Sequence, residues 1–185
     1  FIAPVNWLLE SGDRFEVGLI PVGERLKEPF QVVDGISVPA GSYDALRYRG
    51  EVETAAKRKL SVAAEWSFGG FYTGTLDQVE LAATWTPSPV VTLLVNAERS
   101  MGRLEQGDFD LTLVGTKIRL NLSPDLPLNG FLQYDTADHT FGTNTRLRWT
   151  FSPRGDLFVI YNHNLRDLES RWQKQSNQLL VKAQY

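Results

Sequence analysis

The sequence contains no cysteine, which excludes disulfide bridges and thiolate metal sites. No apolar run approaches the about 20 residues that a transmembrane helix requires. The formal net charge is only −3, so there is no electrostatic basis for binding nucleic acid. These absences exclude disulfide-stabilised scaffolds, helical membrane spans and basic nucleic-acid-binding domains.

A basic and then apolar signal peptide is also missing, and the chain opens at Phe1 within apolar sequence. We therefore expect a mature chain or a fragment. A length of 185 residues is sufficient for one domain, so we expect a single domain over residues 1–185 that lacks some preceding strands if the chain is a fragment.

Alternation of apolar and polar residues runs through almost the whole chain, and no segment has the helical period. Side chains on a strand point to opposite faces in turn, so each such segment has one apolar and one polar face. The pattern predicts an all-β chain of ten strands, or eleven if the first, which contains Pro4, is counted. The predicted strands are 2–10, 14–22, 43–54, 60–69, 77–86, 90–100, 109–122, 127–136, 143–152, 156–164 and 177–185.

Short and long connections alternate between these strands. The short ones are rich in Pro, Gly, Ser and Asp, as in Thr86-Pro87-Ser88-Pro89 and Ser152-Pro153-Arg154-Gly155. The long ones are predicted over 23–42, 70–76, 101–108, 137–142 and 165–176. In an up-and-down meander, alternate connections lie at opposite ends of the sheet. This pattern therefore predicts short turns at one end and long loops at the other, as in outer-membrane barrels.

The longest connection, 23–42, contains the signature of a small hairpin. Asp34-Gly35 is a type I′ turn pair between the apolar segments 30–33 and 36–38. We expect an ordered outer loop, with a plug inside the barrel as the alternative.

Alternation alone does not say which face points inward. A soluble barrel places its apolar face inside, and a membrane barrel places it outside. The loop asymmetry favours a membrane barrel, and so does the placement of aromatic residues at two levels, as in the interfacial girdles of such barrels. The residues predicted for the aromatic girdle are Trp66, Phe68, Tyr72, Trp85, Tyr134, Trp149, Phe151, Tyr161 and Tyr185.

Charged residues of both signs occupy the face opposite the aromatic one. A membrane barrel would place them around a wet lumen, whereas a soluble barrel would place them on its exterior. The residues predicted to face the lumen are Arg47, Arg49, Glu51, Glu53, Glu65, Glu80, Glu98, Lys117, Arg119, Arg146, Arg148 and Lys182.

We therefore predict an antiparallel up-and-down transmembrane β-barrel of a Gram-negative bacterial outer membrane, or the C-terminal part of a larger barrel. The expected role is that of a membrane anchor, a structural barrel or a transport and pore element, without enzymatic activity or a cofactor. The expected partners are outer-membrane lipid, lipopolysaccharide and other subunits of an outer-membrane complex. A soluble barrel that binds a small apolar ligand is the alternative.

The last predicted strand, 177–185, is amphipathic and closes on the aromatic Tyr185. It resembles the C-terminal signal by which the outer-membrane assembly machinery recognises barrel substrates. The barrel assembly machinery is therefore an expected partner during biogenesis.

Several stretches together resemble one family of large bacterial outer-membrane proteins. These proteins carry an N-terminal module like the family 9 carbohydrate-binding modules and a C-terminal barrel of unknown function. The resemblance implies a barrel domain without the soluble module, and it supplies no catalytic residues. It rests on Glu28-Pro29-Phe30, Pro39-Ala40-Gly41-Ser42-Tyr43, residues 66–74 (WSFGGFYTG), Gln106-Gly107-Asp108-Phe109, Ser152-Pro153, residues 156–162 (DLFVIYN) and Leu179-Leu180-Val181-Lys182.

An outer-membrane hydrolase is a further alternative, with His163 as the base and Ser170 or Ser176 as the nucleophile. No motif marks either serine, and His139 and His163 are expected to be solvated. The acids of the outer loops match no calcium-loop spacing, so we expect no metal site. The basic run 55–59 is expected to be a solvated turn, and Gly69-Gly70 an aid to strand twisting.

Overall fold

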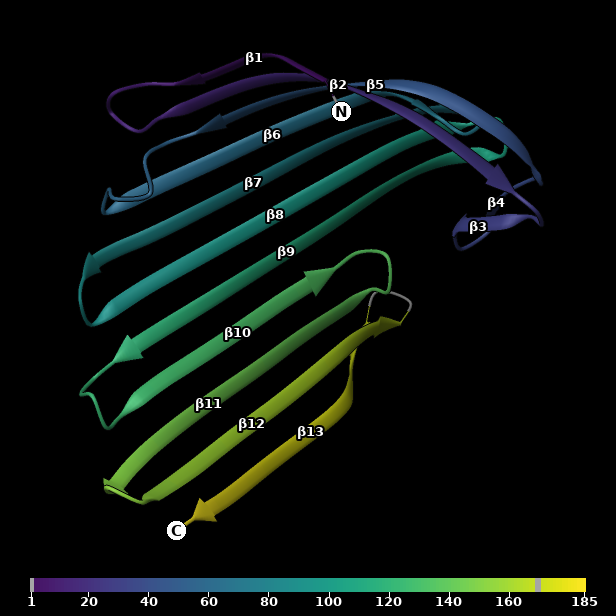
Figure 1. Ribbon diagram of the computed structural model, residues 1–185. Coiled ribbons are helices and arrows are strands. Elements are labelled where there is room, and N and C mark those ends of the chain that lie inside the picture. Colours follow the sequence, from purple (N-terminus) through teal and green to yellow (C-terminus); the bar gives the residue numbers. More distant parts are fainter. Residues whose placement is uncertain (1, 169–170) are drawn as a thin grey trace. The chain divides into compact units, whose positions relative to one another are not determined.

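The computed structural model describes residues 2–168 and 171–185, which form strands and turns (Figure 1). The fold is all-β, as predicted. No helical segment in these ranges has the length and hydropathy needed to span a bilayer. The strands are β1 (Ile2–Leu8), β2 (Arg14–Leu26), β3 (Phe30–Val33), β4 (Ile36–Val38), β5 (Gly41–Glu53), β6 (Leu60–Phe71), β7 (Gly74–Ser88), β8 (Val91–Leu104), β9 (Gly107–Asn121), β10 (Pro127–Asp135), β11 (Thr140–Ser152), β12 (Gly155–Leu168) and β13 (Arg171–Gln184).

Eleven of these strands form one antiparallel sheet in the order β1-β2-β5-β6-β7-β8-β9-β10-β11-β12-β13. Each strand therefore neighbours the next one along the chain, apart from the small hairpin β3–β4. All eleven predicted strands are confirmed, including the first. Its pairing with β2 shifts register between Ile2 and Val5, where Pro4 cannot donate a backbone hydrogen bond.

The chain divides into two compact units. Unit 1 comprises Phe1–Leu81 and Glu98–Thr112, and unit 2 comprises Ala82–Ala97 and Leu113–Tyr185. Each unit is described separately below.

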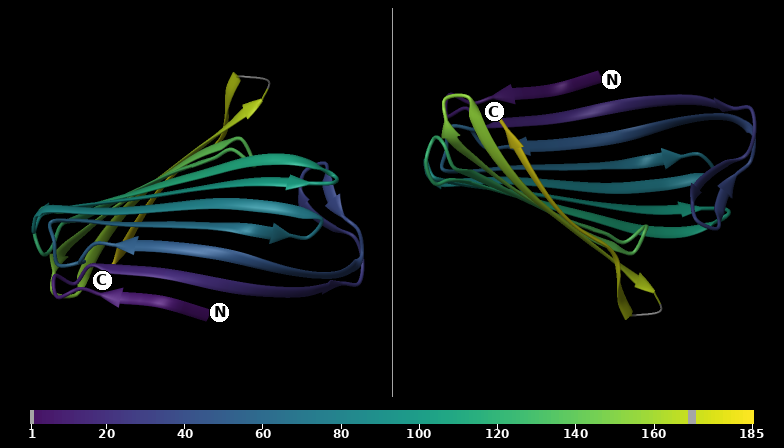
Figure 2. Two further views of the ribbon diagram at one scale, coloured as in Figure 1. Left: turned by 90° about the horizontal axis from the view of Figure 1, so that it is seen from above. Right: turned by 90° about the horizontal axis from the view of Figure 1, so that it is seen from below.

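The hairpin β3–β4 of unit 1 confirms the small hairpin predicted within the longest connection. Figure 2 shows it at the end of strands β2 and β5. Gly35 adopts a φ of +81° in its turn, as the Asp34-Gly35 pair predicts. Val38 of this hairpin is fully buried.

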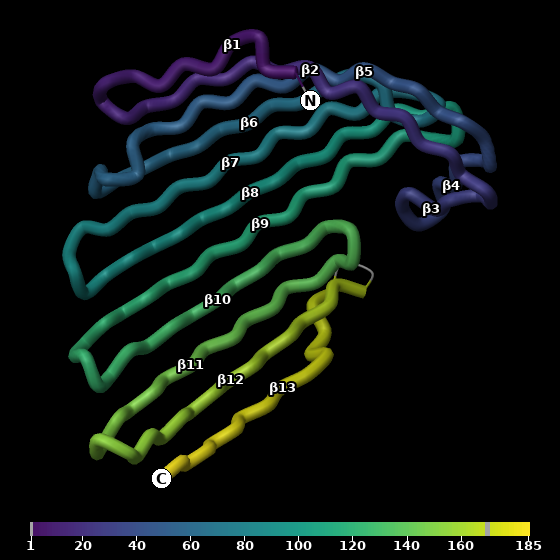
Figure 3. Tube along the Cα trace, viewed as in Figure 1, coloured from purple at the N-terminus to yellow at the C-terminus, as the bar shows by residue number. Residues whose placement is uncertain are grey.

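The prediction of long connections at this end is wrong for the other four. β6 and β7 are joined by Tyr72-Thr73, and β8 and β9 by Glu105-Gln106. β10 and β11 are joined by residues 136–139, while β12 extends to Leu168 and β13 begins at Arg171. The strands continue into segments that sequence analysis assigned to loops, because backbone pairing needs no alternation of side chains. Connections at the other end are as short as predicted, like the turn between β11 and β12 in Figure 3.

Gly69 allows β6 to approach β5 closely. Its φ is +138°, a conformation that L side chains rarely adopt, and it pairs with Arg47. A Cβ atom at this position would lie 2.4 Å from the carbonyl oxygen of Leu46. Gly69 thus lets β6 continue alongside β5 beyond the aromatic pair Trp66 and Phe68.

Very little of the apolar content is buried. Among the described residues, the buried apolar side chains are Val38, Ala55, Leu76 and Leu104. Hydrophobic residues nevertheless make up 42% of the sequence. Most apolar side chains of residues 2–168 and 171–185 are therefore partly or largely exposed.

Candidate functional site

The polar face of unit 1 is built by the register of three strands, β2, β5 and β6. Glu16 of β2 lies directly opposite Glu51 of β5, and Glu51 lies opposite Glu65 of β6. Arg49 occupies the next row on the same face, because residues two apart on a strand point the same way. The residues predicted to face the lumen on these strands therefore share one face.

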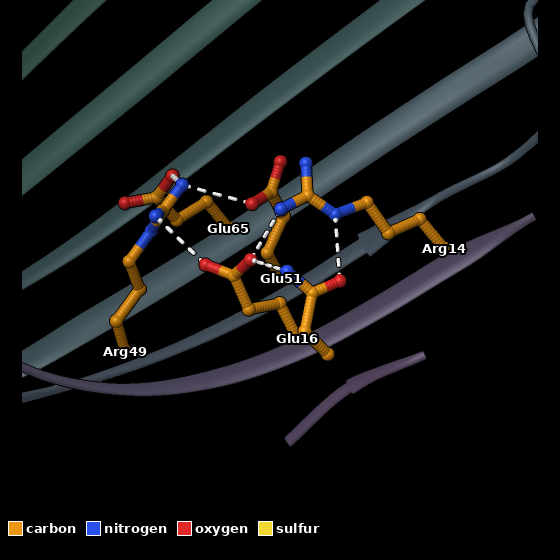
Figure 4. Close-up of polar contacts among 6 residues, drawn as sticks. Arg14, Glu16, Arg49, Glu51 and Glu65 are labelled. Carbon is orange, nitrogen blue, oxygen red and sulfur yellow. Dashed lines mark hydrogen bonds and ion pairs between the residues drawn. The ribbon is translucent and has the colours of Figure 1, made fainter. Parts of the chain in front are cut away.

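Two arginines hold this row of carboxylates together (Figure 4). Arg49 forms ion pairs with Glu16 at 3.2 Å, with Glu51 at 2.8 Å and with Glu65 at 2.7 Å. Arg14 forms a second ion pair with Glu16. A planar guanidinium presents donors in several directions, so one arginine can bridge three strands.

A second polar chain crosses the same face around Arg47. Its guanidinium donates to Ser67 Oγ at 3.1 Å and to Gln78 Oε1 at 2.8 Å. Gln78 donates in turn to Ser100 at 3.2 Å, and Ser100 donates to Glu98 at 3.3 Å. The chain connects β5, β6, β7 and β8, so side-chain hydrogen bonds reinforce the backbone pairing across unit 1.

Several of these polar groups are buried. Glu16 is 2% exposed, and Arg47 and Ser67 are each 8% exposed. Asn6 Nδ2 donates to Glu16 at 2.8 Å, so this carboxylate accepts hydrogen bonds from Asn6, Arg14 and Arg49. A buried carboxylate is tolerated only when it is paired in this way.

The two remaining predicted acids of unit 1 belong to the same face. Glu53 lies opposite Ala63 of β6 and, on the other side, opposite Arg14 of β2. Glu80 interacts electrostatically with Glu65, Glu98 and Arg49. Carboxylates therefore outnumber guanidinium groups on the polar face of unit 1.

The polar face of unit 2 has the opposite charge. The five predicted lumen cations of this unit share one face, as their register partners show: Lys117 opposite Phe131, Arg119 opposite Asn129, Arg146 opposite Asn129 and Ile160, and Arg148 and Lys182 opposite Phe158. Lys117 lies 5.7 Å from the centre of the Phe131 ring, and Arg146 lies 4.9 Å from that of Phe158. Contacts with aromatic faces replace ion pairs here.

The opposite face of unit 2 is apolar. One row crosses five strands without a polar residue, because each member lies opposite the next: Leu120, Leu128, Leu147, Val159 and Val181. Trp149 and Phe151 lie at one end of this face, with ring centroids 5.9 Å apart. Tyr134 lies toward the other end and contacts Trp172 at 6.3 Å.

Most of the other predicted girdle residues are also exposed, while Phe68 is half-buried, and they do not all lie at two levels. In unit 1, Trp66 and Phe68 stack at 4.5 Å, and Tyr48 stacks on Phe68 at 5.3 Å. In unit 2, Tyr161 lies one row from the aliphatic row and opposite Leu179. Among the remaining members, Trp85 is 47% exposed and Tyr185 is 94% exposed.

Tyr72, assigned to the girdle, lies in the turn between β6 and β7 at the centre of an aromatic cluster. Its ring is 5.3 Å from that of Tyr43 and 6.1 Å from that of Phe30. Its hydroxyl donates to Glu24 at 2.9 Å. The turn is thereby connected to β2, to β5 and to the β3–β4 hairpin.

We expect Tyr72 to titrate abnormally. Burial, the hydrogen bond to Glu24 and the charge of that carboxylate raise the pKa of Tyr72 to about 12 from 10.0. The contribution of the neutral phenol to stability is therefore complete below pH 10 and is lost as the pH rises through about 12. Ultraviolet titration of the chain and of Tyr72→Phe isolates this group. Glu24→Gln should lower its pKa but leave it above 10, and an unchanged pKa would contradict the contact.

The residues proposed for a hydrolase are not brought together. Ser176 lies opposite Asn164 and accepts a hydrogen bond from it at 2.8 Å. His163 lies on the other face of β12, where it stacks on Tyr161 with ring centroids 6.2 Å apart. Ser170 lies outside the described residues, and His139 is exposed in a turn with a φ of 52°.

Acidic loop residues have local structural partners. Asp34 accepts from Gln31 at 3.1 Å, and Asp135 accepts from the backbone of Ala137 at 2.8 Å. Over residues 2–168 and 171–185, no three carboxylate or imidazole groups converge on a point that could hold a metal ion. In the basic run, Arg58 pairs with Asp13 at 2.7 Å, which connects two neighbouring turns.

Sequence reasoning missed Arg14 and Glu16, and Glu16 is the most buried member of the ionic network. Both stand at alternate polar positions of a predicted strand, so the pattern contained the information needed to include them. It also missed Trp172 and the side-chain amides of β10–β13, which no periodic pattern marks.

A scan against protein-family models finds no match for this chain, and a search of curated proteins finds no similar sequence.

Proposed function

We propose that this chain forms the wall of a bacterial outer-membrane β-barrel, with a non-enzymatic role as an anchor or transport element. Its apolar face would meet lipid and its polar face an aqueous interior. The observation that carries the proposal is that unit 1 buries charged side chains and exposes large apolar ones. The carboxylate-bearing Glu16 is 2% exposed, whereas Trp7 and Trp66 on the other face are 64% and 51% exposed.

The shortage of buried apolar residues supports the same proposal. A water-soluble domain of this length derives most of its stability from an apolar core. Here Leu179 and Val181 are 65% and 59% exposed, and they continue the apolar rows of β12. Exposed apolar rows of this kind are stable only against a partner or a lipid phase.

The dimensions of the strands suit a bilayer. A membrane-spanning strand needs about 9–11 residues, and β5 to β9 and β11 to β13 each contain 12–15. On the apolar face of β11, Phe141 and Phe151 are separated by about 33 Å at a rise of about 3.3 Å per residue. At a tilt of about 40° this path covers about 25 Å, the height of the apolar band of outer-membrane barrels.

The soluble barrel with an apolar ligand is less well supported. It would turn the rows around Leu147 inward and the network of Glu16 and Arg49 outward to bulk water. An exterior salt bridge is worth little and needs no buried supporting residues, yet Arg47 and Ser67 are buried beside this network.

The role of the wall depends on how wide the finished barrel is. About eight strands enclose an interior filled by side chains, and open porins have about 16. A wall of eleven strands is nearer the first case, which favours an anchor or structural barrel. Planar-bilayer recordings distinguish the two roles, because a transport pore gives discrete conductance steps and an anchor gives none.

The proposed partners follow from the two faces and from the last strand. Lipid and lipopolysaccharide would cover the apolar face, and other subunits of an outer-membrane complex would join at its margins. The amphipathic β13, followed by Tyr185, is the segment that we propose the barrel assembly machinery recognises. The motif resemblance to C-terminal barrel regions of large outer-membrane proteins is part of this proposal.

The absence of cysteine allows a direct test with single cysteines. Leu147→Cys and Arg148→Cys are neighbours on β11 that face opposite sides of the sheet. Each is labelled with a nitroxide in the chain folded into lipid vesicles. We expect the label at 147 to collide mainly with oxygen, which partitions into lipid, and the label at 148 with a water-soluble nickel chelate.

The opposite result has a clear meaning. A label at 147 that is inaccessible to both reagents would indicate a dry protein core and favour the soluble barrel. Failure of the chain to partition into vesicles at all would likewise overturn the membrane proposal.

A further inference from the structure

The polar face of unit 2 contains a groove of about 390 Å³ over β10–β13. No ionisable side chain lines this groove. Its chemistry comes mainly from side-chain amides and two aromatic rings, namely Gln133, Asn144, Asn162, Asn164, Gln175, Gln178, Phe131 and Phe141. None of these residues belongs to the ionic network of unit 1 and none of them is charged, although Lys117 lies opposite Phe131 at the end of the same row.

Strand register explains how the amides are brought together. Phe131, Asn144, Asn162 and Gln178 form one row across four strands, since each lies opposite the next. The adjacent row contains a glycine, Gly142, which leaves space above the sheet. A Cβ atom on Gly142 would lie 3.0 Å from the amide oxygen of Asn164, so a larger residue would crowd the groove.

These amides have hydrogen-bonding capacity left for a ligand. Asn144 donates to the side-chain oxygen of Asn162, and Asn164 donates to Ser176 at 2.8 Å. A side-chain amide has two N–H donors and an oxygen with two lone pairs, so one contact uses only part of it. The groove therefore presents donors and acceptors side by side along its length.

We propose that this groove binds a neutral saccharide. Sugar hydroxyls are both donors and acceptors, and amides are the uncharged side chains that match both functions. The apolar face of a sugar ring would pack on Phe131, which lies at one end of the amide row. The inference rests on the proposed function, because it takes this face to line a water-filled interior.

Charged neighbours lie beside the groove but do not line it. Lys117 sits over Phe131, and Arg146 lies one row away with its guanidinium over Phe158. An acidic sugar would therefore be held by these cations, and its binding would weaken with salt. A neutral sugar in the amide groove would bind with little dependence on salt.

The test uses the full chain folded in a detergent without a sugar headgroup, titrated with maltotriose by isothermal calorimetry. Asn162→Ala and Gln178→Ala each remove an amide from the groove, and we expect each to weaken binding by about tenfold. The matched control is Gln184→Ala, which removes an amide from the same face of β13 outside the groove and should leave binding unchanged. Circular dichroism checks that every variant retains its strands, and Gln178→Ala on the edge strand serves if Asn162→Ala misfolds.

Three outcomes would overturn the proposal. The first is that the folded chain gives no heat of binding with maltotriose, which would indicate that the amides have only a structural role. Another is an equal effect of Gln184→Ala. The third is tighter, salt-sensitive binding of trigalacturonic acid, which would move the site to the basic rows. Because the titration is done in detergent, it is independent of the nitroxide test, and the two proposals can fail separately.

Discussion

Replacement of Arg49 by alanine should lower the free energy of unfolding by about 2–3 kcal/mol. The guanidinium neutralises Glu16, Glu51 and Glu65 on three strands, and its removal leaves their carboxylates facing one another. Breaking a fully buried ion pair from one side costs about 3–5 kcal/mol. The smaller value expected here reflects the 24% exposure of the Arg49 side chain. Equilibrium urea unfolding in detergent measures the change.

Arg99→Ala is the matched control for this experiment. Arg99 also pairs with a carboxylate, that of Asp110 at 2.5 Å, but the two side chains are 56% and 51% exposed. An exposed pair contributes little to stability, so this variant should unfold almost like the parent chain. Equal losses in the two variants would contradict a special role for the Arg49 network.

Leu179→Arg should reduce stability in lipid vesicles by about 2–4 kcal/mol. Leu179 lies on the apolar face of β13, opposite Tyr161 and one row from the aliphatic row. An arginine at the midplane of the lipid-facing surface of an outer-membrane barrel costs this amount, because its charge must leave water. The measurement is reversible urea unfolding of the chain in lipid vesicles.

Leu180→Arg supplies a close comparison, because the same substitution is made at the next residue. Leu180 lies opposite Ile160 on the polar face, with Gln178 and Lys182 as its neighbours along the strand, so an arginine there would meet water. We expect a change below about 1 kcal/mol, typical of a surface substitution. If Leu180→Arg is the more damaging of the two, the faces have been assigned the wrong way round.

The strands could be predicted because alternation is a local property of the sequence. A segment such as β6 shows its two faces residue by residue, from Leu60 to Phe68. The β3–β4 hairpin could be predicted for a similar reason, since Asp34-Gly35 specifies its turn by backbone conformation.

The extent of the strands could not be predicted. The end of β8 and the start of β9 mix polar and apolar residues without a period, as in Met101-Gly102-Arg103. Backbone hydrogen bonds continue through such segments because they do not depend on which side chains are attached. Most of the described residues in the four expected loops therefore belong to strands, so that within the described residues only the connection between β2 and β5, with its β3–β4 hairpin, remains long at that end.

The residues of the site could be predicted only in part from the sequence. The sequence places Arg49 and Glu65 on polar positions, but which carboxylates share one guanidinium depends on the register between strands. Register is set by turn geometry and by close approaches such as that at Gly69. The amide groove of β10–β13 depends on register in the same way, since its members come from four separate strands.

The number of strands in the sheet has a geometric consequence for closure. In an antiparallel series of eleven, the first and last members run in the same direction, so β1 and β13 point the same way along the sheet. A seam made by joining these two edges directly would be a parallel pair, with the slanted hydrogen bonds of that geometry. An antiparallel seam requires an odd number of further strands between the edges, whatever their source. Whether the number of strands is odd or even, rather than the chemistry of the two faces, thus determines whether the closing pair of strands is parallel or antiparallel.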